Sequence, residues 1–168
     1  MRIRTSMFIV STLALGCARS PDNMSSPILD TPDIPSTRVV DSSRLWLVKG
    51  RDSDLSIMRS SPDAARDPRM LELWLKTTNV AAVAHSEPGE ALTAAHKELT
   101  IQDKGNGLFC VLAFSSSNVT PIGPGEIATL ELERDADGPM RVEILTDRPM
   151  FAPQEAQQGL IVGDPIEL

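Results

Sequence analysis

From Val39 onward the chain contains several segments in which apolar and polar residues alternate. The clearest are RMLELWLKT at 69–77, EIATLELERD at 126–135 and PMRVEIL at 139–145. Successive side chains of a β-strand point to opposite faces, so a period of two predicts strands with one buried side and one solvent-facing side. The first segment is expected to bury its leucines and to expose the residues between them, Glu72, Trp74 and Lys76.

The remaining segments complete an all-β pattern. GLFCVLAF at 107–114 is apolar on both sides, as expected of a central strand that is covered on each face. SRLWLVKG (43–50) and GLIVGDPIEL (159–168) are expected to form outer strands, and groups of Gly, Pro, Asn and Asp separate the strands. This spacing predicts an antiparallel β-sandwich. GEALTAAHKEL (89–99) fits either a short helix or an irregular strand that crosses between the sheets.

The N-terminus has the pattern of an export signal. Arg2 and Arg4 precede an apolar run at 7–15, which is shorter than the roughly 20 residues that span a bilayer but typical of a secretory signal. Gly16 stands directly before Cys17, and ALGC at 14–17 resembles the lipobox of bacterial lipoproteins. In that family the cysteine becomes the new N-terminus and carries acyl chains such as palmitate. The resemblance predicts a signal peptide at 1–16 and lipidation of Cys17; the alternative is an ordinary signal peptide with an incidental cysteine.

A segment rich in Pro, Ser and Asp follows at 17–38 and is expected to be an extended tether, which leaves 39–168 as one domain. Removing residues 1–16 leaves 14 basic and 23 acidic residues, a net charge of −9 that disfavours binding to nucleic acid or anionic lipid. Membrane attachment would therefore depend on the lipid anchor. The residue after the cysteine is Ala18 and not Asp, which favours the outer membrane within a cell-envelope location.

The order of turns and strands from Met70 to Gly163 resembles a cohesin domain. The matching features are the L-x-L strand at 71–75, the glycine at 89, the apolar strand at 111–114, the glycine-containing turn at 123–125, the strand at 127–132 and the closing strand at 159–162. The aromatic-Asp-Pro of the family is replaced by Trp74-Leu75-Lys76, and residues 39–68 match poorly. The resemblance implies a nine-stranded jelly-roll sandwich and a non-catalytic module that binds a protein. Family cohesins bind dockerins, but a single copy suits cohesin-like domains of envelope proteins with no known dockerin.

The sequence offers no strong catalytic or metal-binding pattern. His85 and His96 are eleven residues apart, which is not a metal-ligand spacing, and the serines at 115–117 lack a nucleophile motif. Asp135 and Asp137 fit a hydrophilic hairpin better than a calcium site, because a full set of oxygen ligands is not visible. We expect neither enzyme activity nor a cofactor, and no disulfide, since Cys110 is the only cysteine besides Cys17.

Two binding functions remain. The first is protein binding through a face that carries Glu72, Trp74 and Lys76 beside Phe109 and Val111, with the second sheet or a loop as an alternative cover for the central strand. The second is polysaccharide binding, for which Trp46 and Trp74 could form an aromatic platform if both point outward. A loop or the N-terminal segment could equally cover the two indoles.

Overall fold

The computed structural model describes residues 42–148 and 150–168. The predicted signal peptide, Cys17, the tether and the domain boundary after residue 38 lie outside this range. No helix within the described residues is long and apolar enough to cross a membrane.

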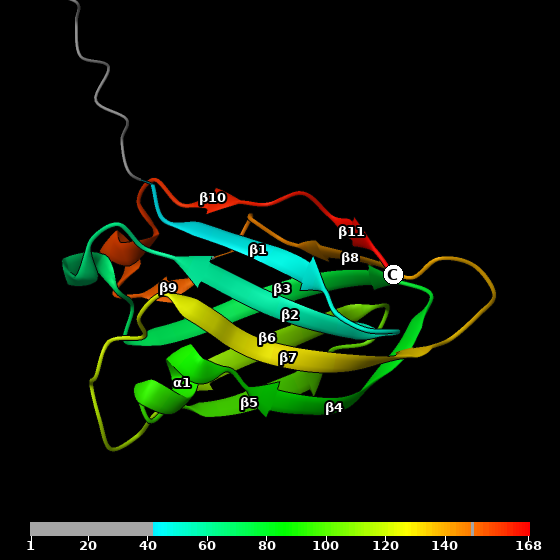
Figure 1. Ribbon diagram of the computed structural model, residues 1–168, viewed down its shortest axis with the longest axis horizontal. Coiled ribbons are helices and arrows are strands. Elements are labelled where there is room, and N and C mark those ends of the chain that lie inside the picture. The colour runs from blue at the N-terminus through cyan, green and yellow to red at the C-terminus, as the bar shows by residue number, and fades with distance from the viewer. Residues whose placement is uncertain (1–41, 149) are drawn as a thin grey trace, which may run out of the picture. The chain divides into compact units, whose positions relative to one another are not determined.

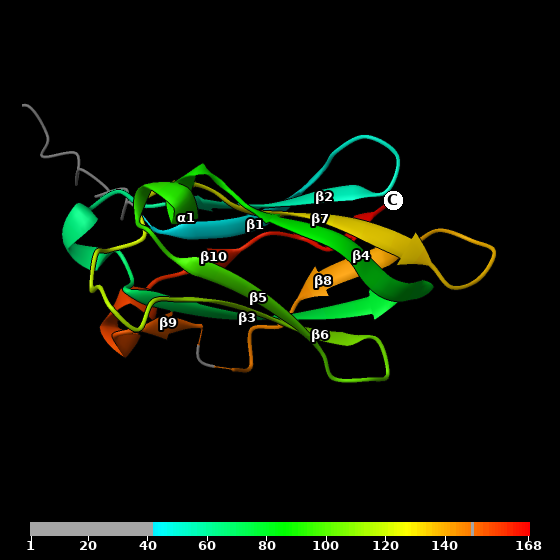
Figure 2. The same ribbon diagram turned by 90° about the horizontal axis from the view of Figure 1, so that it is seen from below.

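The described chain folds into two stacked sheets, seen in Figures 1 and 2. The five-stranded sheet has the order β10 (Ile161–Val162), β1 (Arg44–Lys49), β2 (Asp54–Ser60), β7 (Gly125–Arg134) and β4 (Val80–Pro88). The six-stranded sheet has the order β11 (Ile166–Glu167), β8 (Arg141–Ile144), β3 (Met70–Thr78), β6 (Leu108–Phe114) and β5 (Glu98–Asp103), with β9 (Phe151–Ala152) paired to the start of β3. The predicted all-β sandwich is confirmed. One pair departs from the antiparallel expectation, because β10 runs parallel to β1.

Alternation along the strands builds the core as the sequence predicts. Leu71, Leu73 and Leu75 of β3 are at most 1% exposed. Their counterparts on β6 and β7 are at most 4% exposed, and each buried Leu, Ile, Val or Phe side chain contributes about 1.5–3 kcal/mol by leaving water. Glu72 and Trp74 are half-buried and Lys76 is exposed, so the division of β3 into an inner and an outer side is confirmed.

The ambiguous segment at 89–99 contains a short helix. Helix α1 (Glu90–Ala94) follows Gly89 and ends before β5 begins at Glu98. A Cβ atom at residue 89 would lie 2.3 Å from the backbone oxygen of Glu126, so only glycine lets the chain approach β7 this closely. Leu92 is then fully buried beneath the helix.

A buried ion pair fixes the loop that holds the short 3-10 helix η1 (Ala64–Arg66). Arg59 of β2 donates from Nη2 to Oδ1 of Asp67 at 2.9 Å and from Nη1 to the backbone oxygen of Ile122 at 2.9 Å. The Arg59 side chain is completely buried, and its guanidinium also lies 5.6 Å from the ring centroid of Phe151. This one side chain therefore connects the β2–β3 loop, the β6–β7 loop and strand β9 at the same end of the sandwich.

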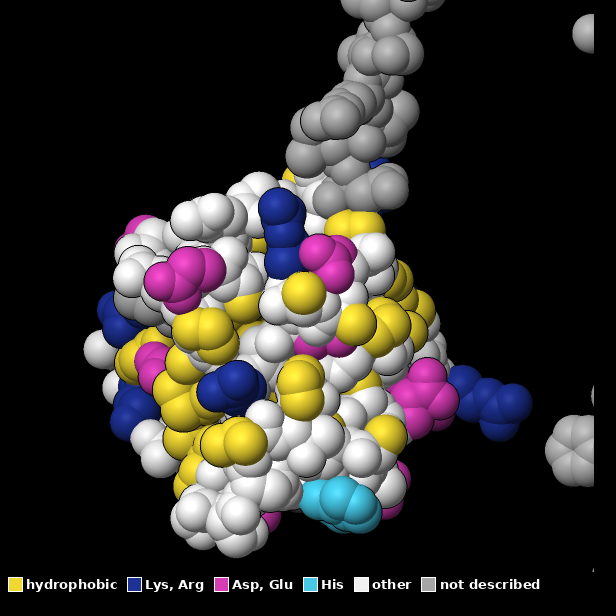
Figure 3. All heavy atoms as spheres, turned by 90° about the vertical axis from the view of Figure 1, so that its left-hand side faces the viewer, with side chains coloured by type: hydrophobic (Ala, Val, Ile, Leu, Met, Phe, Trp, Pro, Cys, Tyr) yellow, Lys and Arg dark blue, Asp and Glu magenta, His cyan; other side chains and the backbone are white. Residues whose placement is uncertain are grey.

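A second buried basic residue, in the turn between α1 and β5, holds the same β6–β7 loop at that end. Lys97 donates from Nζ to the side-chain oxygen of Asn118 at 3.0 Å and to its backbone oxygen at 3.2 Å. Burial, with the nearby charge of Arg69, lowers the pKa of Lys97. Figure 3 looks onto the left-hand end of Figure 1, which carries α1, η1 and η2 (Gln154–Gln157), and shows hydrophobic side chains in several groups among charged ones.

Candidate partner-binding face

The outer side of the six-stranded sheet carries an apolar row over its central strands. The strand register places Trp74 of β3 opposite Cys110 of β6, and Glu72 opposite Leu112. We call this side the β3–β6 face; it consists of Met70, Glu72, Trp74, Lys76, Leu108, Cys110, Leu112 and Phe114. Most of its apolar side chains are half-buried, and Met70 is 38% exposed, so the row remains accessible to a partner.

Two contacts hold the Trp74 indole in place, one at the edge of the ring and one on its face. Its Nε1–H donates to Oε1 of Glu72 at 2.7 Å. On the ring face, the guanidinium carbon of Arg148, from the β8–β9 loop, lies 3.9 Å from the ring centroid. A cation over an indole at this distance makes a favourable cation–π contact. The aromatic residue near the centre of the β3–β6 face is therefore fixed by a carboxylate at its edge and a cation above it.

The sequence hypothesis placed five residues on one binding face, and the structure separates them. Phe109 and Val111 are only 3% and 0% exposed, because they lie opposite the inward-pointing Leu75 and Leu73. Their place on the binding surface is therefore a wrong prediction. Because β6 is apolar on both sides, its sequence does not indicate which of the two alternating sets of side chains faces the core. The structure places Phe109 and Val111 in the core and the residues that alternate with them, which include Leu112, on the β3–β6 face.

Cys110 lies in the same apolar row but is 6% exposed. Burial, and then the negative charge of Glu72, raises the pKa of its thiol, while Lys104 and Arg148 act in the opposite direction with smaller effect. The thiol is therefore held in its neutral form, and it packs as a small apolar side chain.

Solved structures with the same arrangement of strands are cohesins. The third cohesin ScaC of Acetivibrio cellulolyticus, solved in complex with the ScaB dockerin, has a TM-score of 0.57 and 13% sequence identity over 75% of this chain and 98% of its own. The seventh ScaB type I cohesin of Pseudobacteroides cellulosolvens has a TM-score of 0.50 and 11% identity over 75% of this chain and 90% of its own. The domain has a cohesin-like fold. No protein-family model matches the chain, and no curated protein sequence is similar to it.

The cohesin-like domain keeps its two tryptophans apart. Trp46 of β1 stands between Leu45 and Leu47, which are buried in the core, so it lies on the outer side of the five-stranded sheet. Trp74 lies on the outer side of the other sheet. The two indoles thus lie on opposite faces of the sandwich, and the aromatic platform considered from the sequence does not form.

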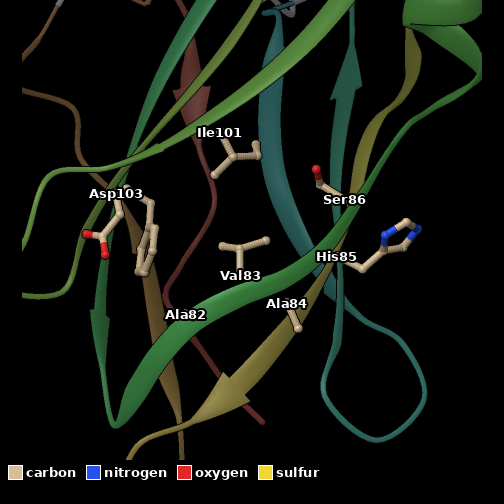
Figure 4. A pocket seen from close by; sticks show the side chains of 8 residues that line it. Ala82, Val83, Ala84, His85, Ser86, Ile101 and Asp103 are labelled. Atoms are coloured by element: carbon tan, nitrogen blue, oxygen red, sulfur yellow. The ribbon is translucent and has the colours of Figure 1, made fainter.

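A pocket of about 400 Å³ lies between β4 and β5 of the cohesin-like domain, shown in Figure 4. The side chains of Val83 and Ile101 point into it, whereas His85 points away. Nε2 of His85 lies 3.1 Å from Oε1 of Glu87, and both side chains are more than 60% exposed to solvent. An exposed pair of this kind is weak and lacks the third group that orients a catalytic base.

The other candidate residues are also dispersed within the cohesin-like domain. His96 lies in the turn between α1 and β5, away from His85 on β4. Asp135 and Asp137 lie in the loop that leads from β7 of the five-stranded sheet to β8 of the six-stranded sheet, so the hairpin expected from the sequence is a wrong prediction. No group of three or more His, Cys, Asp or Glu side chains within the described ranges could hold a metal ion.

Proposed function

We propose that the protein is a non-catalytic lipoprotein of the cell envelope whose cohesin-like domain binds another protein through the β3–β6 face. The observation that carries this proposal is the apolar row of that face, in which Met70, Leu112 and Phe114 keep part of their surface in contact with water. Contiguous exposed apolar side chains with charged neighbours are typical of protein interaction sites.

The fold comparison supports a protein partner. The ScaC cohesin, which has the higher TM-score of the two relatives described above, was solved with a dockerin bound. At 13% identity this likeness concerns the fold, so the identity of a dockerin as the partner here does not follow from it. The proposal is therefore a protein partner of unassigned family.

The envelope location depends on the N-terminus. The order of Arg2 and Arg4, the apolar run, Gly16 and Cys17 supports export and lipidation, and the tether at 17–38 would then hold the domain away from the outer membrane. Expression in the native host with radiolabelled palmitate tests this part. We expect labelling of the wild-type chain and none of Cys17→Ser; equal labelling of both, or of neither, would contradict it.

The binding function is tested by capture from the envelope fraction of the native host with matched variants. Leu112→Arg places a charge in the centre of the β3–β6 face, and Ser56→Arg places the same charge on the central strand β2 of the opposite sheet. We expect the wild type and Ser56→Arg to retain the same protein and Leu112→Arg to lose it. Retention by Leu112→Arg would contradict the proposal, and recovery of a polysaccharide with no enriched protein would favour a carbohydrate-binding module instead.

A further inference from the structure

We infer that Arg148 and Trp74 together form a receptor for a carboxylate, so that the partner segment that fits the β3–β6 face is acidic. This inference rests on the proposed function, because it specifies the chemistry of the partner at the same face.

The guanidinium of Arg148 is preorganised to bind an anion. It lies over the Trp74 indole, with its central carbon 3.9 Å from the ring centroid, and the residue is exposed. Within residues 42–148 and 150–168, no ion pair joins Arg148 to a carboxylate. The contact with the indole restricts the side chain but leaves the N–H groups at the guanidinium edge available, and these match the two oxygens of a carboxylate.

Glu72 holds the indole and forms no ion pair with Arg148. Its Oε1 accepts the hydrogen bond from Nε1 of Trp74 at 2.7 Å, at the edge of the ring, whereas Arg148 lies over the ring face. The indole is thus held from two directions, which reduces the conformational entropy that Arg148 would lose when it binds an anion.

Further positive charge lies near the receptor. Lys76 is exposed on the same side of β3 as Trp74, and Lys104 follows β5. Lys104 and Arg148 both act to lower the pKa of the Cys110 thiol, which lies opposite Trp74, whereas Glu72 raises this pKa with a larger effect.

Carboxylates limit the positive region. Glu72 is bonded to the indole, and Glu143 of β8 lies opposite Lys76 in the strand register. Glu98 of β5 lies opposite Phe114, and the exposed Asp147 directly precedes Arg148. The apolar side chains of Leu112 and Phe114 lie farther along the face. The complementary segment therefore carries a carboxylate for Arg148 within a few residues of an apolar side chain for the row on β6.

Two short peptides test this chemistry directly. The full chain carrying Cys17→Ser and Trp46→Phe gives one indole NMR signal, from Trp74, and is titrated with acetylated and amidated Glu-Leu-Glu-Leu or Lys-Leu-Lys-Leu. We expect the acidic peptide to shift the Trp74 Nε1–H and Arg148 Nε–H signals and the basic peptide to leave them in place. Arg148→Gln should weaken binding of the acidic peptide about tenfold or more, as expected for loss of a charge-assisted contact.

Arg141→Gln is the matched control, because it removes the same charge from an exposed position on the neighbouring strand β8. Equal weakening by Arg141→Gln and Arg148→Gln, or equal shifts with the basic peptide, would overturn the inference. The proposed function is tested by a different result: it is contradicted if the Leu112→Arg variant still captures the partner protein. If Leu112→Arg abolishes capture and Arg148→Gln leaves it unchanged, the face binds a protein but the carboxylate receptor is wrong.

Discussion

The buried pair of Arg59 and Asp67 makes a sharp prediction about stability. The Arg59 side chain is 0% exposed and that of Asp67 is 6% exposed, and Nε of Arg59 already has no hydrogen-bond partner among the described atoms. Asp67→Ala would leave the guanidinium with only the Ile122 carbonyl as acceptor. Removing one member of a buried ion pair costs about 3–5 kcal/mol, because the other charge stays buried without compensation. For a domain of this size the midpoint of thermal unfolding should fall by about 10–20 °C.

Asp63→Ala is the control within the same loop. Asp63 caps η1 by accepting a hydrogen bond from the Ala65 amide at 2.9 Å, but it is exposed, and loss of such a cap costs about 1 kcal/mol. The double variant Arg59→Met/Asp67→Ala removes both charges and should be more stable than Asp67→Ala alone.

Urea unfolding of the full chain carrying Cys17→Ser, followed by circular dichroism, measures all of these free energies of unfolding. The reasoning is refuted if Asp67→Ala costs no more than Asp63→Ala. It is also refuted if the double variant loses as much free energy of unfolding as Arg59→Met and Asp67→Ala lose in sum, or more, since the two residues would then not act as a pair.

Three other predictions concern the fold. Gly105 and Gly107 both have positive φ, but only at Gly107 would a Cβ atom meet a backbone oxygen, at 2.5 Å. In the same urea assay Gly105→Ala should lower the free energy of unfolding by about 1 kcal/mol and Gly107→Ala by clearly more. Equal losses would contradict this. Burial raises the pKa of Cys110, so iodoacetamide at pH 8 should alkylate it slowly in folded Cys17→Ser protein and rapidly in urea; similar rates would contradict this. Burial lowers the pKa of Lys97, so the unfolded chain holds more protons between this lowered pKa and the ordinary lysine value; stability should rise with pH there, and Lys97→Met should reduce the rise. An unchanged slope in that variant would show that another group titrates.

Alternation along the strands made most of the sandwich predictable. A strand with one apolar side can bury only that side, so the inward-facing residues of β3, β7 and β8 followed from the sequence. Helix α1 did not follow, because its place depends on the contact between Gly89 and the backbone of Glu126, which lies 37 residues farther along the chain. The parallel pairing of β10 with β1 likewise joins segments that are far apart in the sequence, and no local sequence pattern indicates that they pair.

The candidate site was only partly predictable. The outward position of Glu72, Trp74 and Lys76 followed from the buried leucines between them. The two sides of β6 are both apolar, so the sequence could not tell that Phe109 faces the core and Leu112 the outside. Arg148 was missed because it comes from the β8–β9 loop, where no periodic pattern indicates which strand a side chain will cover.

The central claim is that the β3–β6 face binds a protein, and site-specific photocross-linking in the native host tests it most directly. The photoreactive residue p-benzoylphenylalanine would replace Leu112 in one variant and Ser56, on the outer side of the other sheet, in a second. The account predicts one discrete protein adduct at position 112 and none at position 56. Adducts of the same mass at both positions, or an adduct at position 56 alone, would contradict it.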